Sequence, residues 1–338
     1  MNINSQRNSL LAFGAVLAAL AVPATAAADN DHSRGERVEL DNGRLLVEAG
    51  NGADAVALRL PAGDATRIQV DFGDDGSAEA TVLRANVAAI KVAGGNGPDA
   101  LRIDDTNGAF TDTIPTTIAG ENGGDKLQGG AGAEQLKGGR GDDHVDGGRG
   151  NDTGRLGRGE DTFQWDPGEG SDVIEGRTGI DTMLFNGGSG PTGDDDVVMS
   201  ANGGRLTFFR QPANITMDTN DVEVVRFNAL GGSDDVTVND LTGTDVLLTE
   251  LELASAIGGN ASDGVVDNVI VNATDGVDTI DLAGNGSGVD VTGLASAVSV
   301  THADSTDTLS VNTLGGADNV FAAGIAGAMQ VSVDGSPL

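Results

Sequence analysis

The sequence predicts an all-β protein built as a stack of short β-coils, and three observations point to this class. Aromatic side chains make up only 3% of the 338 residues, with one Trp and no Tyr, whereas glycine supplies 53. Such a composition disfavours a globular core of large side chains. Glycine pairs recur every nine residues within 118–185, and no segment after the first apolar run shows sustained helical periodicity. Together these features favour a solenoid.

The first segment has the pattern of an export signal. Arg7 precedes the apolar run "LLAFGAVLAALAV" (10–22), which is too short to span a bilayer and is closed by Pro23. Small residues at cleavage spacing follow in Ala24-Thr25-Ala26. We therefore expect residues 1–26 to be a signal peptide, and the mature protein to be periplasmic or extracellular with no membrane span. The absence of cysteine means that something other than disulfides must stabilise an exported chain.

Next along the chain, residues 27–117 are expected to form a β-rich, solenoid-like region. Residues 118–185 contain seven consecutive nine-residue repeats, here called lines. The lines are GENGGDKLQ (120–128), GGAGAEQLK (129–137), GGRGDDHVD (138–146), GGRGNDTGR (147–155), LGRGEDTFQ (156–164), PGEGSDVIE (167–175) and GRTGIDTML (176–184). The sixth place is always acidic, and the eighth place is apolar in six of the seven lines. The eighth place is expected to point inward and to supply most of the core: Leu127, Leu136, Val145, Gly154, Phe163, Ile174 and Met183.

These lines resemble the nonapeptide G-G-x-G-x-D-x-U-x of repeats-in-toxin (RTX) proteins, which bind calcium. The pattern of glycines, one acid and one apolar residue is specific here because seven copies stand in tandem over about a fifth of the chain. The resemblance implies a tight glycine-rich turn and a short strand in each line, with two lines per coil of a right-handed parallel β-roll.

The residue types themselves suit a hard cation. Glycine at places one, two and four permits positive φ and lets backbone carbonyls turn inward, and calcium takes six to eight oxygen ligands. One turn cannot supply so many oxygens, so stacked turns should share an ion, with rows formed by alternate lines. We expect about three to five ions. The candidate carboxylate ligands are Asp125, Glu134, Asp142, Asp143, Asp152, Asp161, Asp172 and Asp181. The candidate carbonyl ligands belong to Gly120, Gly123, Gly130, Gly132, Gly139, Gly141, Gly148, Gly150, Gly157, Gly159 and Gly170.

Three departures from the pattern predict weak points. Glu134 is longer than Asp, and Gly154 is expected to leave the core of its coil empty. A two-residue slip at Trp165-Asp166 is expected to interrupt the second row of acids near Asp172.

The flanking regions repeat a weaker motif, G-x-D-x-[VIL], at spacings of 40 to 45 residues, between alternating strands. We expect long coils of a β-helix or related solenoid on both sides of the array, although ordinary Asp-Gly turns in β-sandwiches would give similar motifs. Residues 289–335 also resemble segments beside the arrays of bacterial hemolysin-type calcium-binding proteins. Residues 186–338 form the acidic C-terminal region, with 22 acids against 3 bases. Within it, GDDDVV (193–198) is interpreted as a solvated loop rather than a second cation site.

The formal charge of −33 excludes a nucleic-acid partner, because such binding needs a basic face. No H-E-x-x-H helix, G-x-S-x-G elbow, P-loop or cysteine nucleophile occurs, and His32, His144 and His302 form no zinc motif. The sequence therefore predicts an exported calcium-binding solenoid with folding coupled to Ca²⁺. Its role would be structural or adhesive, with cell-surface glycans or proteins as candidate partners. A polysaccharide lyase, epimerase or hydrolase on a β-helix is the alternative.

Overall fold

The computed structural model describes residues 35–190, 192–325, 327 and 329–338. The predicted signal peptide lies outside the described residues. Two sheets contain all of the described strands. Single turns of 3-10 helix, Arg84–Asn86 and Asp105–Asn107, follow the strands β5 (Ala80–Leu83) and β7 (Ala100–Asp104). Among the described residues, no helix is long and apolar enough to cross a membrane. The fold is all-β, as the composition predicted.

The first sheet, sheet A, has 15 strands. In spatial order they are β1 (Arg37–Asp41), β2 (Arg44–Glu48), β6 (Ala89–Asn96), β8 (Thr116–Asn122), β10 (Gln135–Arg140), β12 (Thr153–Arg158), β14 (Val173–Thr178), β18 (Ile215–Asn220), β17 (Arg205–Gln211), β16 (Asp196–Asn202), β20 (Asp235–Val238), β22 (Asn268–Asn272), β26 (Thr308–Asn312), β28 (Gln330–Val333) and β29 (Ser336–Pro337).

The second sheet, sheet B, has 14 strands. In spatial order they are β27 (Asn319–Ala323), β23 (Thr279–Gly284), β24 (Val289–Thr292), β25 (Ala297–Thr301), β21 (Leu248–Glu252), β19 (Val224–Asn228), β15 (Thr182–Asn186), β13 (Thr162–Trp165), β11 (His144–Asp146), β9 (Lys126–Gln128), β7 (Ala100–Asp104), β3 (Ala55–Arg59), β4 (Arg67–Phe72) and β5 (Ala80–Leu83).

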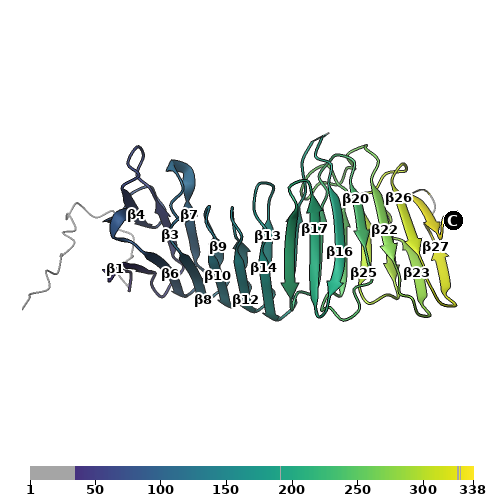
Figure 1. Cartoon of the computed structure of the whole chain (residues 1–338), viewed down its shortest axis with the longest axis horizontal. Helices are drawn as coiled ribbons and strands as arrows, with labels where there is room; N and C mark the ends of the chain where they lie inside the picture. Colours follow the sequence, from purple (N-terminus) through teal and green to yellow (C-terminus); the bar gives the residue numbers. More distant parts are fainter. Residues whose placement is uncertain (1–34, 191, 326, 328) are drawn as a thin grey trace, which may run out of the picture. The chain divides into compact units, whose positions relative to one another are not determined.

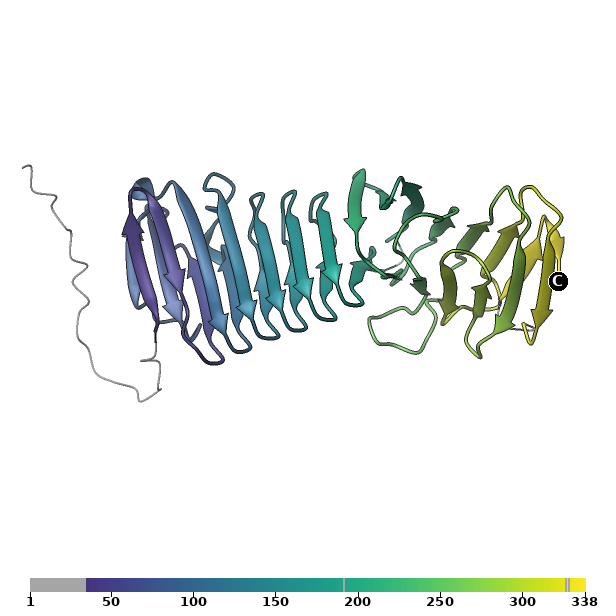
Figure 2. The same ribbon diagram turned by 90° about the horizontal axis from the view of Figure 1, so that it is seen from below.

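From β6 to β15 the chain alternates strictly between the sheets, so each of these coils gives one strand to sheet A and one to sheet B (Figure 1). Strands of successive coils pair in parallel and in register within the array, for example Leu136 with Gly154 and Val145 with Phe163. Both pairs are 18 residues apart, so two nine-residue lines make one coil. The blue and teal strands in Figure 2 show this regular parallel stacking. The coils form a β-roll, as the repeat predicted.

The flanks continue the same two sheets with longer coils. Arg44 of β2 pairs with Ala89 of β6, and Asn268 of β22 pairs with Thr308 of β26, both in parallel. The parallel pairing rules out β-sandwiches for these flanks. Among the described strands, antiparallel pairing is added at five places, which the sequence patterns did not predict: β1–β2, β3–β5, β16–β18, β23–β25 and β28–β29.

Alternating side chains of both sheets share a single hydrophobic core. The predicted eighth-place residues are all buried. The prediction of an empty core at Gly154 was wrong. A β-carbon at Gly154 would lie 2.7 Å from Cδ2 of Phe163, so the Phe163 ring of the other sheet already fills the space. Leu156, which replaces the first glycine of its line, is also fully buried beside it. One missing side chain is therefore compensated by two larger neighbours.

The slip at Trp165-Asp166 is absorbed locally. Glu169 N–H donates to the Asp166 carbonyl at 3.2 Å, and Trp165 Nε1–H donates to the Gly170 carbonyl at 2.8 Å, which closes a small turn. Across the turn, the pairing distance along the chain grows from 18 to 20 residues, as in Thr162 with Thr182. The rows of acids continue past it, so the predicted interruption near Asp172 was wrong.

Candidate metal centre

The acids of the array lie at the turns between the two sheets. Turns from sheet A to sheet B carry one set of acids, and turns from B to A carry the other. The sixth-place acids therefore separate into two rows by alternate lines, as the repeat predicted. Row 1 contains Asp125, Asp143, Asp161 and Asp181, and row 2 contains Glu134, Asp152 and Asp172.

Each row is held by one repeated hydrogen bond. The backbone N–H of each acid donates to the first carboxylate oxygen of the acid in the next coil, for example Asp125 N–H to Asp143 Oδ1 at 2.8 Å. The same bond joins Asp143 to Asp161, at 2.8 Å, and Glu134 to Asp152, at 2.6 Å. It also crosses the slip, where Asp152 N–H donates to Asp172 Oδ1 at 2.7 Å. Each of these accepting carboxylates thus has one oxygen fixed by the backbone of the preceding coil.

The second oxygen of each carboxylate is buried and has no hydrogen-bond partner. A buried carboxylate oxygen without a donor or a cation is energetically costly. Within the array these unpartnered atoms are Oδ2 of Asp125, Asp143, Asp152, Asp161, Asp172 and Asp181, together with Oε1 of Glu134. In the described part of the chain, none of these seven acids forms an ion pair with a basic side chain. The atoms available as metal ligands are therefore all oxygens, are anionic and are regularly spaced, which suits a hard cation.

Glycine keeps the space beside these oxygens open. A β-carbon at Gly138 would lie 2.4 Å from both Asp143 Oδ2 and the Leu156 carbonyl oxygen. At the fourth place, a β-carbon on Gly141 would lie 2.0 Å from the carbonyl oxygen of Gly123 in the preceding coil. Gly141 also has a φ of +109°, which L-side chains rarely adopt. The turns therefore bring carbonyl and carboxylate oxygens close together only because these positions lack side chains.

Burial makes the ionised state of the acids unfavourable. It raises the pKa of Asp143, Asp172 and Asp181 to about 7, and neighbouring carboxylates add to the shift. The pKa of Asp152 rises to about 9 for the same reasons, burial first and the charges of Asp172 and Glu134 after it. Backbone N–H donors oppose these shifts in pKa but do not cancel them. A bound cation would keep these groups ionised at neutral pH.

The predicted ligand Asp142 lies apart from this set. It is exposed, and its Oδ1 accepts the backbone N–H of Glu160 in the next coil at 2.9 Å. Its charge nevertheless contributes to raising the pKa of both Asp143 and Asp161, after the larger effect of their burial. Asp142 therefore contributes to the local field from outside the buried rows, and its role as a ligand stays a prediction.

Row 1 begins before the array. Asp54 N–H donates to Asp99 Oδ1 at 2.9 Å, and Asp99 N–H donates to Asp125 Oδ1 at 2.8 Å. Asp99 Oδ2 is buried and unpartnered, and a β-carbon on Gly94 would lie 2.4 Å from it. Residues 94–102 read GGNGPDALR, a complete copy of the nonapeptide. An insertion separates this copy from the tandem lines, so the pattern of the flanking regions includes only its shorter G-x-D motif.

A third row, row 3, lies at B-to-A turns beyond the array. Asp195, Asp234, Asp267 and Asp307 are linked by the same N–H to Oδ1 hydrogen bonds, at 2.7 to 3.0 Å. The interpretation of 193–198 as a solvated loop was therefore wrong, because Asp195 is buried and belongs to this row. The segment GDDDVV mixes one buried acid with two less buried ones, and composition alone does not separate them.

One further group of carboxylates lies at the slip. Asp146, Asp166 and Glu169 offer oxygen atoms that all lie within 4.8 Å of one another. All three are only half-buried, and each accepts a hydrogen bond from a neighbouring group. This group is thus less demanding of a cation than the buried rows are.

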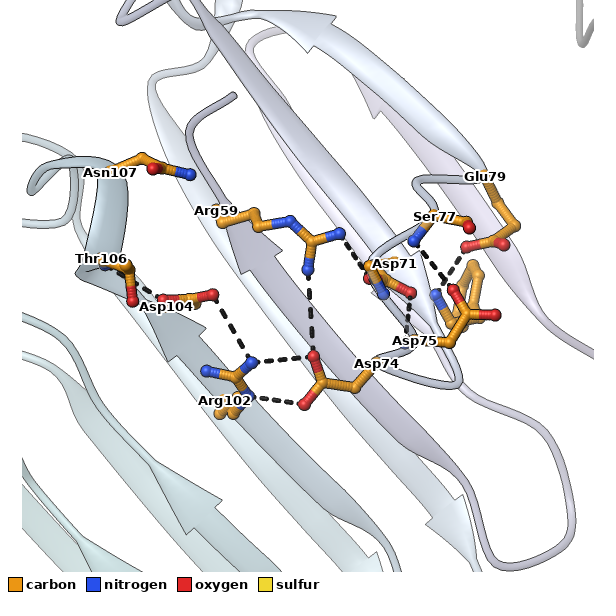
Figure 3. A network of polar contacts seen from close by, with 12 residues as sticks. Arg59, Asp71, Asp74, Asp75, Ser77, Glu79, Arg102, Asp104, Thr106 and Asn107 are labelled. Atoms are coloured by element: carbon orange, nitrogen blue, oxygen red, sulfur yellow. Dashed lines mark hydrogen bonds and ion pairs between the residues drawn. The ribbon is translucent and has the colours of Figure 1, made fainter. Parts of the chain in front are cut away.

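The N-terminal coils show how the chain balances acids elsewhere. Arg102 binds both oxygens of Asp74, with Nε–Oδ2 at 2.6 Å and an Nη2–Oδ1 hydrogen bond at 2.8 Å (Figure 3). Arg59 pairs with the fully buried Asp71 of the adjacent strand. In these N-terminal coils, arginine side chains neutralise the acids. The seven acids of rows 1 and 2 have no such basic partner among the described residues.

The comparisons with known proteins agree with this geometry. A model of the RTX calcium-binding nonapeptide repeat, which spans four copies, matches residues 119–154, 128–163 and 167–190. Neither the curated proteins nor the solved structures give a match to this chain. The likeness is therefore confined to the array and to what its repeats bind.

Proposed function

The chain is a protein with RTX calcium-binding nonapeptide repeats, and from this premise we propose that it is an exported β-solenoid whose folding is coupled to Ca²⁺. We further propose that it serves as a structural or adhesive interaction module. The observation that carries the coupling is the set of buried, unpartnered carboxylate oxygens in rows 1 and 2.

The proposed ligands follow from the rows. Successive acids of one row, such as Asp125 with Asp143 or Asp152 with Asp172, would hold an ion between adjacent coils. Carbonyl oxygens of the glycine turns, such as that of Gly123, would complete the shell. The bound ion would neutralise the carboxylates and link one coil to the next.

The coupling to folding rests on the charge of the array. Without cations, rows of buried carboxylates repel one another, and the glycine-rich backbone loses much conformational entropy on ordering. An ion that binds only the folded coils stabilises them by mass action. Extracellular calcium modules work with dissociation constants of about 10⁻⁴–10⁻³ M. Under this proposal the array orders after export, where calcium is abundant.

Far-UV circular dichroism of the mature chain tests the coupling. The β-signal should be weak in chelator and should rise with added calcium, whereas magnesium should be much less effective because it demands a tighter octahedral shell. An identical β-signal with and without calcium would contradict the proposal.

The interaction role is supported by a basic groove on the array. An open groove of about 700 Å³ runs across the ends of β8, β10, β12 and β14, and Arg140, Arg158 and Arg177 line it together with Glu121. Arg140 and Arg158 are direct register neighbours on adjacent strands, both exposed. No ion pair to any of the three arginines occurs within the described ranges. Like charges at strand spacing are unfavourable unless an anion lies between them.

We therefore assign this groove an anionic polysaccharide, whose charges recur along the chain as the arginines recur along the coils. Binding to immobilised uronate oligosaccharides should be lost in R140Q/R158Q, measured with calcium present and with dextran as the neutral reference. R149Q/R155Q removes the same charge from the array outside the groove and should bind normally. If both double variants lose binding equally, the loss reflects net charge alone, which would contradict the assignment of the groove.

The alternative of a polysaccharide-active enzyme stays a prediction. Incubation with alginate and pectin, followed by assays for unsaturated products and reducing ends, tests it. Turnover that disappears when a carboxylate pair outside the array is changed to amides would favour this alternative.

A further inference from the structure

Row 3 lies outside the RTX match, in turns that lack the nonapeptide. Its four acids precede β16, β20, β22 and β26, at the side of the coils that also carries row 2. Between the two rows stands the antiparallel segment β16–β18. Row 3 is therefore a separate structure built on the same hydrogen bond.

The first acid of row 3 has a permanent cationic partner. Asp195 has both oxygens satisfied, because its Oδ1 binds Arg210 Nε at 2.7 Å and its Oδ2 accepts Gly188 N–H at 2.7 Å. The Arg210 guanidinium is itself held over the Trp165 ring, 5.3 Å from its centroid. The protein thus places a fixed positive charge at the first step of this row.

Asp234 has the same burial but no such cation. Its Oδ1 accepts Asp195 N–H at 2.7 Å, while its Oδ2 is buried without any partner. The residue is 0% exposed. A fully buried carboxylate with one unpartnered oxygen is costly, so Asp234 Oδ2 is a candidate ligand for a cation.

Carboxylates from both adjacent coils surround the turn at 231–234. Asp263 Oδ2 accepts Gly232 N–H at 3.1 Å from the following coil, and Asp194 Oδ1 accepts Ser233 N–H at 2.9 Å from the preceding one. Asp267 Oδ1 accepts Asp234 N–H at 2.9 Å. Gly232 adopts a φ of +115° at this turn. The turn therefore gathers carboxylate oxygens from three coils.

We propose that this turn binds one calcium ion outside the RTX array, with Asp234 Oδ2 as the central ligand and the carboxylates of Asp263 and Asp267 beside it. A hard divalent cation is the chemistry that an all-oxygen, anionic site selects. The ion takes the electrostatic role at Asp234 that Arg210 takes at Asp195. It also ties the 255–265 connection, which carries Asp263, to the turn of the preceding coil. This site does not depend on calcium binding by the array.

Hydrogen exchange followed by mass spectrometry locates the effect on the full mature chain. Calcium should slow exchange in peptides covering 229–240 and 255–268 of the wild type, and D234N should lose this protection. The Asn side chain keeps an acceptor for Asp195 N–H but removes the charged Oδ2. The matched control is D235N, because Asp235 is exposed at the next position and its loss removes the same charge. D235N should keep the protection.

Equilibrium dialysis with radioactive calcium supplies the stoichiometry. D234N should bind one ion fewer than the wild type and D235N the same number, while peptides from 118–185 remain calcium-protected in both. Should D234N fail to fold, D263N provides the second variant, with weaker calcium binding expected at the same peptides. Unchanged stoichiometry and unchanged protection in D234N and D263N would overturn the proposal. A missing calcium response in peptides 118–185 would instead contradict the function proposed for the array.

Discussion

Replacing Asp152 by Asn should have opposite effects with and without calcium. Asp152 is 1% exposed, and burial together with the charges of Asp172 and Glu134 raises its pKa to about 9. The Asn side chain can still accept Glu134 N–H through its carbonyl oxygen, as Asp152 Oδ1 does at 2.6 Å. The substitution therefore removes charge and one calcium ligand while it retains the row's hydrogen bond.

The size of the effect follows from the two pKa values of Asp152. In the unfolded chain the group ionises near pH 3.8, but in calcium-free folded protein it stays protonated up to about pH 9. A raised pKa contributes stability that is complete below pH 3.8 and is lost as the pH rises towards 9. At pH 7 the loss is about 4 kcal/mol, because pH 7 lies about three pH units above the unfolded pKa and each costs about 1.4 kcal/mol. Asn has no such dependence, so calcium-free D152N should gain up to about 4 kcal/mol at pH 7 and nothing near pH 4.

Urea unfolding, followed by fluorescence of the single buried Trp165, measures this difference. In chelator at pH 7, D152N should unfold at a higher urea concentration than the wild type. If the wild type is already unfolded without calcium, D152N alone should show the fluorescence of a buried tryptophan. In saturating calcium the order should reverse, because the wild type alone keeps the full ligand set. Equal destabilisation of D152N in chelator and in calcium would mean that the Asp152 carboxylate is under no electrostatic strain, which would refute the prediction.

Three further effects are expected. In chelator, lowering the pH from 8 to 5 should increase the β-signal of the wild type in circular dichroism, because carboxyl groups with raised pKa values become neutral; loss of signal on acidification would contradict this. G141A should cost about 3 kcal/mol or more beyond G168A in urea unfolding with calcium, since both glycines have nearly the same φ, +109° and +108°, but only Gly141 would drive a β-carbon into a carbonyl oxygen. R59M should lose about 3–5 kcal/mol by leaving Asp71 buried and unpaired, with or without calcium, whereas R67M at an exposed pair should lose at most about 1 kcal/mol. Equal losses in R59M and R67M would show that Asp71 does not need its partner.

The array could be predicted because its residues act locally. The side chain at the sixth place of each line always lies at a turn, and the side chain at the eighth place always points into the core. Because each coil has a fixed number of residues, counting along the sequence is enough to pair Asp125 with Asp143. The compensation at Gly154 could not be counted, because the Phe163 ring that fills its space comes from the opposite sheet. The effect of the slip could not be counted either, because a turn closed by Trp165 and Glu169 leaves the row intact.

Row 3 could not be predicted from the sequence for a different reason. Its coils are of unequal length, with 39, 33 and 40 residues between successive acids, so no fixed period marks Asp195, Asp234 and Asp267 as neighbours. The pairing of Asp195 with Arg210 depends on an antiparallel segment folded back against the turn. Such contacts arise from tertiary packing and have no signature in the local sequence.

The carboxylate rows also make the two ends of the stack inequivalent. Each linking side chain reaches back to the N–H of the coil before it, as in the bond from Asp161 N–H to Asp181 Oδ1 at 3.0 Å. Removing a coil from the N-terminal end only frees an acceptor that water can solvate, whereas removing one from the C-terminal end strands a buried donor, which is costlier. The stack therefore has two chemically different ends, like a polar filament. At the C-terminal end of row 1, Glu223 accepts Asp181 N–H at 2.8 Å and so closes the row. A gene that lengthens this protein by duplicating coils can do so safely only upstream of such a closing acid.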